Sequence, residues 1–153
     1  MSAETDSSRS AVKTVVEKWT AAFIKKDVPT LRALWDDKYD GLVYQAEEFA
    51  APLVTWLHIK HYYRDVLGLV LEKVEKFERT GLWIDVLGDV AFAYTISDAV
   101  MMIAHSPDPY KASVRQTFVV RKVSGVWKII HYHESLQTMP TPEVLKLDEP
   151  DPS

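Results

Sequence analysis

The residues best suited to chemistry lie in the stretch 114–135, VRQTFVVRKVSGVWKIIHYHES, which holds two histidines and an arginine near its ends. A histidine can exchange a proton near neutral pH, and a neighbouring arginine keeps it neutral and therefore able to act as a base. The same guanidinium can bind a carboxylate, a phenolate or a developing enolate oxygen. We therefore predict His133 as a proton shuttle and Arg115 as the group that orients a substrate oxygen.

A purely structural role is the alternative for these side chains. On that interpretation His131 and His133 are hydrogen-bonded parts of the fold, and Arg115 pairs with Asp98 or Glu134. A buried arginine without a partner would be costly, so Arg115 should be paired or ligand-bound on either interpretation.

The turn between the two runs decides which side chains share a face. The runs are rich in β-branched and aromatic residues and flank a Val-Ser-Gly tripeptide at 123–125, which predicts a β-hairpin. A three-residue loop puts Arg115 opposite His133, whereas a two-residue loop puts Gln116 there. The three-residue loop is favoured because glycine would be its third residue, the position where that turn prefers glycine. On the favoured register a polar cluster lies above an apolar floor, which predicts a pocket wall. The cluster is Arg115, Thr117, His131 and His133, and the floor is Val119 and Ile129.

Further candidates lie elsewhere in the chain. Tyr44, on a predicted short strand, can donate a hydrogen bond to a substrate oxygen, and Asp40 just before it can act as a base, although loop aspartates are more often solvated. His58 and His61 share a helix face at three-residue spacing, but no third ligand completes a tetrahedral metal set, so no metal site is predicted. The expected substrate-binding residues are Trp19, His58, Tyr62, Asp98, Thr117 and His131.

The composition excludes several classes of protein. The 153 residues, 47% of them hydrophobic, are enough for one domain with a sizeable core. The chain has no cysteine for a disulfide or thiolate site, and no glycine-rich phosphate loop, so no cofactor is expected. A net charge of −4 without a basic run disfavours nucleic acid as a partner. Neither a signal peptide nor a membrane-spanning apolar run is found, so we expect a soluble, cytoplasmic protein without a membrane partner.

Apolar periodicity predicts helices in the first half of the chain and strands in the second. Residues 69–79 fit either element, with a strand favoured. Helices are expected at 10–26 and at 55–67, with another between them that begins after a cap at Asp27 or Thr30. Strands are expected at 41–46, 82–87 and 90–104, before the hairpin. This order predicts an α+β fold in which three N-terminal helices close a curved, mostly antiparallel sheet.

The expected domain spans residues 10–137. Residues 1–9 are polar and are predicted to be flexible. The segment 138–153 is rich in proline and acidic residues, and we predict a mobile C-terminal tail.

Three stretches resemble the nuclear transport factor 2-like superfamily, in its SnoaL-like branch. WTAAFIKKDVPTLRALWDD resembles the family's first two helices, GDVAFAY resembles the turn that opens its long central strand, and GVWKIIHYHES resembles its final pair of strands. The last stretch is also similar to the hub domain of calcium/calmodulin-dependent kinase. The resemblance covers about residues 10–137 and implies a sheet curled into a cone that the helices close around a pocket.

The resemblance leaves the function open, because one fold hosts many activities. Ketosteroid isomerases have a tyrosine where this chain has Trp19, and their general-base aspartate would fall near Val43 or Tyr44, where this chain has none. The patterns of dehydrochlorinases and epoxide hydrolases are likewise incomplete in this chain. We predict a cofactor-independent lyase, dehydratase or isomerase that uses general acid–base chemistry on a small, largely apolar molecule, aromatic ones included. The alternative is a non-catalytic module for ligand binding or dimerisation.

The hairpin also bears on assembly. Its alternation leaves both faces of the sheet largely apolar, and the helices can cover only one of them. The face predicted to stay uncovered carries Phe118, Val120, Ile130 and Tyr132. A second apolar face predicts a homodimer packed sheet to sheet.

Overall fold

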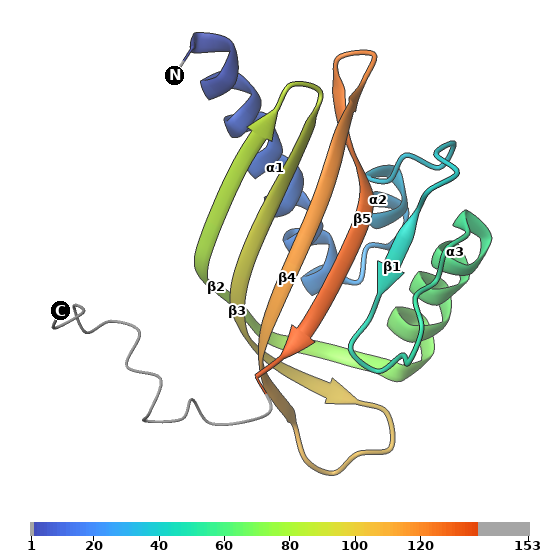
Figure 1. Ribbon diagram of the computed structural model, residues 1–153. Coiled ribbons are helices and arrows are strands. Elements are labelled where there is room, and N and C mark those ends of the chain that lie inside the picture. Colours follow the sequence, from blue (N-terminus) through green and yellow to red (C-terminus); the bar gives the residue numbers. More distant parts are fainter. Residues whose placement is uncertain (1, 138–153) are drawn as a thin grey trace, which may run out of the picture.

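The computed structural model describes residues 2–137, which form an α+β domain with a curved, unclosed sheet (Figure 1). In chain order the elements are α1 (Ala3–Lys25), α2 (Val28–Ala33), β1 (Val43–Gln45), α3 (Trp56–Asp65), the π-helical turn η1 (Val66–Val70), β2 (Leu71–Leu87), β3 (Val90–Ile103), β4 (Tyr110–Val123) and β5 (Val126–Leu136). The strand order is β1-β5-β4-β3-β2, with β1 parallel to β5 and every other pair antiparallel. The predicted fold class is therefore confirmed.

The helix ends follow local capping chemistry. α1 begins earlier than predicted, because the side chain of Ser2 accepts a hydrogen bond from the backbone N–H of Thr5. Asp27 caps α2 by accepting from the backbone N–H of Thr30 at 3.2 Å, which settles the two predicted caps in favour of Asp27. Thr55 caps α3 as predicted.

The ambiguous segment after α3 divides into two elements. A π-helical turn occupies residues 66–70, and a strand then runs without interruption to Leu87. The favoured strand is confirmed, and it is longer than predicted because it joins the strand expected at 82–87. The tail predicted at 138–153 lies outside the described residues.

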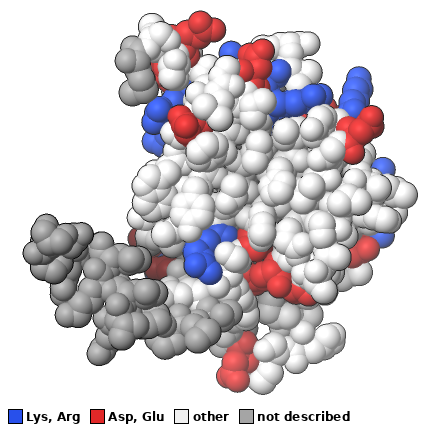
Figure 2. All heavy atoms as spheres, viewed as in Figure 1, with Lys and Arg blue, Asp and Glu red and all other residues white. Residues whose placement is uncertain are grey.

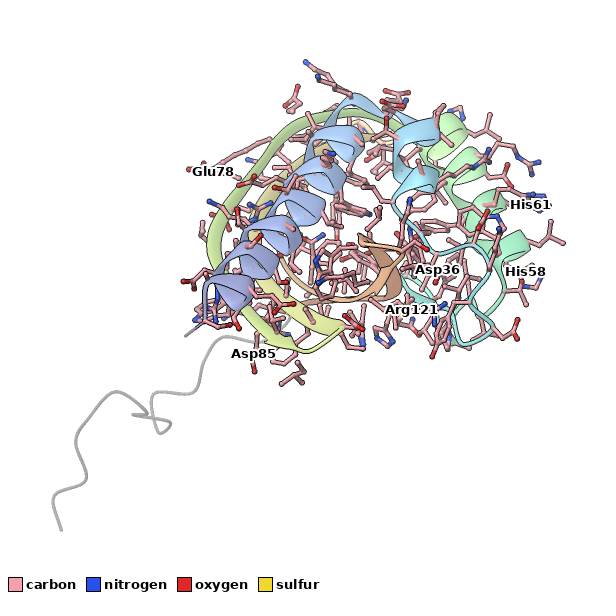
Figure 3. The ribbon with its side chains drawn as sticks, turned by 90° about the horizontal axis from the view of Figure 1, so that it is seen from above. Asp36, His58, His61, Glu78, Asp85 and Arg121 are labelled. Atoms are coloured by element: carbon pink, nitrogen blue, oxygen red, sulfur yellow. The ribbon has the colours of Figure 1, made fainter. Side chains whose placement is uncertain are left out.

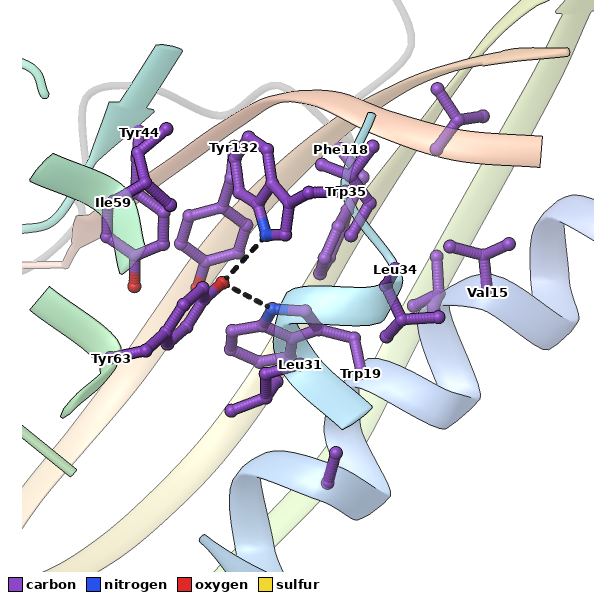
Figure 4. Close-up of a cluster of buried hydrophobic side chains, with 14 of the residues drawn as sticks. Val15, Trp19, Leu31, Leu34, Trp35, Tyr44, Ile59, Tyr63, Phe118 and Tyr132 are labelled. Carbon is purple, nitrogen blue, oxygen red and sulfur yellow. Dashed lines mark hydrogen bonds between the residues drawn. The ribbon is translucent and has the colours of Figure 1, made fainter. Parts of the chain in front are cut away.

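The helices cover the concave face of the sheet, and Figure 3 shows α1 lying inside the curve of the strands. Trp19 of α1 stacks on Tyr132 of β5 with ring centroids 5.0 Å apart. The hydroxyl of Tyr63 on α3 accepts hydrogen bonds from the indole nitrogens of Trp19 at 3.2 Å and Trp35 at 3.0 Å (Figure 4). α1, α3 and the segment that follows α2 are thereby tied to one buried aromatic cluster. None of the helices that the described residues form combines the length and the apolar character that a membrane span requires.

The hairpin register favoured from the sequence is wrong. Val123 pairs with Val126, so the loop has two residues, with φ of 50° at Ser124 and 81° at Gly125. A two-residue turn with positive φ at both positions matches the twist of the strands, and this outweighs the preference for glycine in third place.

A bulge then shifts the register again. The pairing moves by one residue between Val120↔Ile129 and Val119↔His131, which leaves Ile130 unpaired. Beyond the bulge Thr117 faces His133 and Arg115 faces Ser135, so neither predicted neighbour of His133 is found.

The loop and the bulge together decide which side chains lie on the covered face. Phe118 and Tyr132 are opposite each other and fully buried under the helices. The residues predicted to form a pocket wall, Arg115, Thr117, His131 and His133, lie on the convex face instead. The face predicted to stay uncovered carried Phe118, Val120, Ile130 and Tyr132, and for Phe118, Val120 and Tyr132 this is wrong. The two-residue loop pairs Val120 with the buried Ile129, and the bulge then brings Tyr132 to the same covered face.

Candidate active site

A cavity of about 390 Å³ lies between the helices and the ends of the strands. That volume suits a small organic molecule. Most of its wall is apolar and comes from α1, η1, β2 and β3. The main apolar residues of the wall are Trp19, Phe23, Leu71, Phe77, Met101 and Ile103.

The polar groups of the cavity gather on its other side. The parallel pairing of β1 with β5 sets Gln45 beside His133, so the chain that follows β1 runs past Glu134. The backbone N–H of Glu47 donates to Glu134 Oε1 at 3.4 Å. The polar lining residues are Glu47, Glu48, Tyr62, Tyr110 and Glu134.

Glu134 is held by a chain of buried hydrogen bonds. The Tyr132 hydroxyl donates to Glu134 Oε2 at 2.5 Å and accepts from Gln116 Nε2 at 2.7 Å. Gln116 Oε1 in turn accepts from the hydroxyl of Thr95 at 2.9 Å. Oε2 accepts the short bond from Tyr132, whereas Oε1 accepts only the long 3.4 Å bond from the backbone of Glu47, so Oε1 is the oxygen better placed to exchange a proton with a molecule in the cavity.

The surroundings of Glu134 disfavour its charge. Burial raises its pKa to about 8, the nearby Glu47 and Glu48 carboxylates act in the same direction, and the hydrogen bond from Tyr132 opposes them. A carboxyl group with a pKa near the working pH can both give and take a proton, as general acid–base catalysis requires.

Two further carboxyl groups complete the polar side. The Tyr110 hydroxyl donates to Glu47 Oε1 at 2.8 Å, and burial raises the pKa of Glu47. The second oxygen of Glu47, Oε2, is buried and has no hydrogen-bond partner among the described residues. The Tyr62 hydroxyl donates to Glu48 Oε1 at 2.8 Å.

The leading pair predicted from the sequence lies outside this cavity. His133 is exposed on the convex face and borders a neighbouring hollow, which shares Glu47 and Glu134 with the cavity. Arg115 donates from Nη2 to the backbone oxygen of Leu136 at 2.7 Å. The catalytic roles proposed for both residues stay predictions, without support from the lining of the cavity.

The two histidines on β5 lie near each other. Their rings are 6.4 Å apart. Burial lowers the pKa of His131, and His133 lowers it further. Thr117 lies opposite His133, so three of the four members of the predicted polar cluster are neighbours.

The remaining predicted residues are divided between the cavity and the surface. Trp19 and Tyr62 line the cavity. Tyr44 is buried directly behind it, with its ring centroid 4.8 Å from that of Tyr62, and burial raises its pKa. Asp40 and Asp98 are both exposed.

The histidines of α3 are not part of the cavity wall. Figure 3 shows His58 and His61 on the outer side of α3. Among residues 2–137, no three histidine, aspartate or glutamate side chains lie close enough together to hold a metal ion.

Sequence reasoning missed Glu134, Glu47 and Tyr110. The signal for Glu134 was the adjacent pair Ile129-Ile130, which breaks the alternation of apolar residues and is typical of a bulge. Glu47 and Tyr110 carry no such signal, because both lie at the edges of loops and enter the site only through the tertiary fold.

Comparisons with known proteins agree with this architecture. The sequence profile of the SnoaL-like domain matches residues 12–140. No curated protein sequence matches the chain. Solved structures are similar in fold at low sequence identity.

Three of these structures illustrate the range. A nuclear transport factor 2-like superfamily protein from Salmonella enterica serovar Typhimurium is 15% identical, with a TM-score of 0.79 over 91% of this chain and 97% of that one. A protein provisionally named a scytalone dehydratase, from Novosphingobium aromaticivorans, is 14% identical, with a TM-score of 0.76 over 92% and 91%. A type 3 hexachlorocyclohexane dehydrochlorinase from Novosphingobium barchaimii is 13% identical, with a TM-score of 0.72 over 90% and 92%.

Proposed function

The chain belongs to the SnoaL-like domain family, within the nuclear transport factor 2-like superfamily, and from that premise we propose a cofactor-independent enzyme that moves protons on a small, largely apolar molecule. The reaction class is a lyase, dehydratase or isomerase. The observation that carries the proposal is Glu134, a carboxyl group with its pKa raised to about 8, oriented by Tyr132 and facing an apolar cavity.

The names of the structural relatives support this class at a coarse level. A dehydratase removes water and a dehydrochlorinase removes hydrogen chloride, in each case by taking a proton from one carbon atom and a leaving group from the next. Such a reaction needs one group that takes a proton and another that assists the leaving group.

The cavity offers a group for each role. Ionised Glu47 takes a proton from a substrate carbon, and the electrons of that C–H bond form a C=C bond to the neighbouring carbon. The bond from that neighbouring carbon to its oxygen substituent breaks, and protonated Glu134 supplies the proton that turns the departing oxygen into water or an alcohol. Burial raises the pKa of Glu134 to about 8, so this group holds its proton at neutral pH and can serve as the general acid.

The apolar wall contributes selectivity. Trp19 and Phe23 stack with centroids 5.1 Å apart, and Phe77 lies edge-on to Phe23 at 5.4 Å. Flat, rigid side chains of this kind suit a cyclic or aromatic substrate.

The experiment is an activity screen without added metal or nucleotide, over hydroxylated aromatics and small cyclic alcohols. Replacement of Glu134 by glutamine preserves the shape and the hydrogen bond from Tyr132 but removes proton transfer, so turnover should fall by ~10²–10⁴-fold. Glu78→Gln is the matched control, because Glu78 is exposed and lies away from the cavity (Figure 3).

His133→Ala separates this proposal from the assignment made from the sequence. Turnover that survives in His133→Ala and is lost in Glu134→Gln supports Glu134 as the proton-transfer group. The reverse result would restore His133 and refute the role proposed for Glu134.

The second candidate is a non-catalytic ligand-binding module. It is favoured by one observation: each carboxyl group in the cavity already accepts a hydrogen bond from a tyrosine. Saturable binding of a compound from the screen without any turnover would support this candidate.

A further inference from the structure

The cavity has two chemically different halves. One half is built from the rings of Trp19, Phe23 and Phe77 together with aliphatic side chains. The other half holds three carboxyl groups, contributed by Glu47, Glu48 and Glu134, and no lysine, arginine or histidine is among the lining residues in the described part of the chain. The charge of the cavity is therefore of one sign.

Among residues 2–137, no ion pair neutralises the like charges in this half. Glu47 and Glu48 both raise the pKa of Glu134, and Glu48 raises the pKa of Glu47. The tyrosines donate hydrogen bonds but bring no positive charge.

One acceptor in this half has no donor. Glu47 Oε1 accepts from Tyr110, but Oε2 of the same carboxyl group is buried without a hydrogen-bond partner among residues 2–137. An unpartnered buried oxygen is costly, and a bound molecule that donates a hydrogen bond would remove that cost.

The donor is better supplied by an organic cation than by a metal ion. No three of the described carboxyl and imidazole groups converge in a geometry that could hold a metal. An ammonium group instead donates separate hydrogen bonds in several directions and suits carboxylates that are spread along one wall. An apolar body attached to it would lie between the aromatic rings of the other half.

We propose that the cavity takes a small amine with a ring-sized apolar body, whose ammonium group binds between Glu47 and Glu134. This inference rests on the proposed function, because it names the substrate class of the same cavity. It requires an amphipathic ligand whose charged end contacts the acidic half and whose ring contacts Trp19 and Phe23.

Binding of an ammonium group should release protons from the protein. An adjacent positive charge lowers the pKa of a carboxyl group, so Glu134, about half-protonated at pH 8, should ionise when the amine binds. Amine affinity should therefore rise between pH 6 and 8, while the amine itself stays protonated. The groups that face Glu134 are Glu47 and Glu48 from the connection after β1, Tyr44 from β1, Tyr62 and Tyr63 from α3, Tyr110 from β4 and Tyr132 from β5. Burial raises the pKa of all these tyrosines, so they stay neutral over this range.

The test uses three probes of similar shape on the full chain: 2-phenylethylamine, 2-phenylethanol and 3-phenylpropanoate. Isothermal titration calorimetry at pH 7 in buffers of different ionisation enthalpy gives both affinity and protons released. We expect the amine to bind at least about tenfold more tightly than the alcohol, and the carboxylate to bind more weakly than both, since charge-assisted hydrogen bonds are the stronger ones.

Two variants locate the ammonium group. Glu47→Gln and Glu134→Gln keep the tyrosine hydrogen bonds and should each weaken amine binding by about tenfold while leaving alcohol binding within about twofold. Glu78→Gln should leave all three affinities unchanged. If one of the two cavity variants does not fold, the other still tests the site.

The outcomes separate this inference from the proposed function. Equal affinity for amine and alcohol, preferred binding of the carboxylate, or amine binding that Glu47→Gln and Glu134→Gln leave unchanged would overturn the amine. Turnover of neutral compounds that depends on Glu134 would, in those cases, leave the enzymatic proposal intact. Tight amine binding with proton release supports the amine, even if no turnover of any probe is found and the enzymatic proposal fails.

Discussion

Glu134 lies between a hydrogen-bonded interior and an apolar cavity, and its protonation should be visible in the stability of the protein. An unfolded glutamate ionises near pH 4.5, whereas burial raises the pKa of folded Glu134 to about 8. Between these values the folded state binds more protons than the unfolded state. The free energy of unfolding should therefore fall as the pH rises, by up to ~1.4 kcal/mol per pH unit, and level off above about pH 8.

Chemical denaturation at pH 5, 6, 7 and 8 measures this dependence. Glutamine does not titrate, so Glu134→Gln should flatten the curve, and the remaining slope should come from other groups such as Glu47, whose pKa is also raised. Parallel curves for the two proteins would mean that Glu134 is ionised in the folded state at these pH values.

Tyr63 is a second residue whose contribution to the fold depends on one atom, its hydroxyl oxygen. Its hydroxyl accepts from two buried indole nitrogens, those of Trp19 and Trp35. Tyr63→Phe leaves both donors without a partner, and we expect a loss of about 1–3 kcal/mol for each buried group left unsatisfied. Thermal and urea unfolding measure the change.

Tyr62→Phe is the matched control for that substitution. Tyr62 precedes Tyr63 on α3, but it donates to the exposed carboxylate of Glu48. Its loss should cost clearly less than the loss of Tyr63. Equal effects would show that the two indole bonds contribute little to stability.

At the scale of the elements, much of the fold could be predicted from the sequence. Asp27 and Thr55 have side chains that cap helices, and apolar spacing locates α1 and α3. These features depend on neighbours within one turn of chain, so the local sequence determines them.

The face of the last strand could not be predicted in the same way. One unpaired residue, Ile130, exchanges the inner and outer sets of side chains along half of β5. The predicted site therefore contained His133 instead of Glu134. Trp19 and Tyr62 were predicted to contact substrate from their helix positions, and both line the cavity.

At the scale of the whole molecule, the convex face of the sheet has a large apolar area without cover from the helices. Trp83, Leu87 and Phe92 expose 55%, 63% and 39% of their surface. Figure 2 shows a broad uncharged area over the strands, with most charged side chains towards its margins. Apolar areas of this kind mark interaction surfaces.

The predicted homodimer is therefore proposed on this face, with residues that differ from those first expected. Trp83→Arg should weaken it, because a charge would be buried against a partner. Light scattering at micromolar concentration should report a dimer for the unaltered chain and a monomer for the variant. Glu78→Arg is a control on the same strand whose side chain is already solvated. A monomeric unaltered chain would remove the proposal.

The bulge at Ile130 changes which alternate residues of β5 face the helices. Before it, the odd-numbered residues Trp127 and Ile129 are the buried ones, and after it the even-numbered Tyr132 takes that place. In an alanine scan along β5, the most destabilising substitutions should fall at odd-numbered positions before Ile130 and at even-numbered positions after it. On the convex side such a scan would test the proposed association between copies, and on the concave side it would test the proposed proton transfer. Substitutions on the two faces should therefore affect these two proposed properties separately.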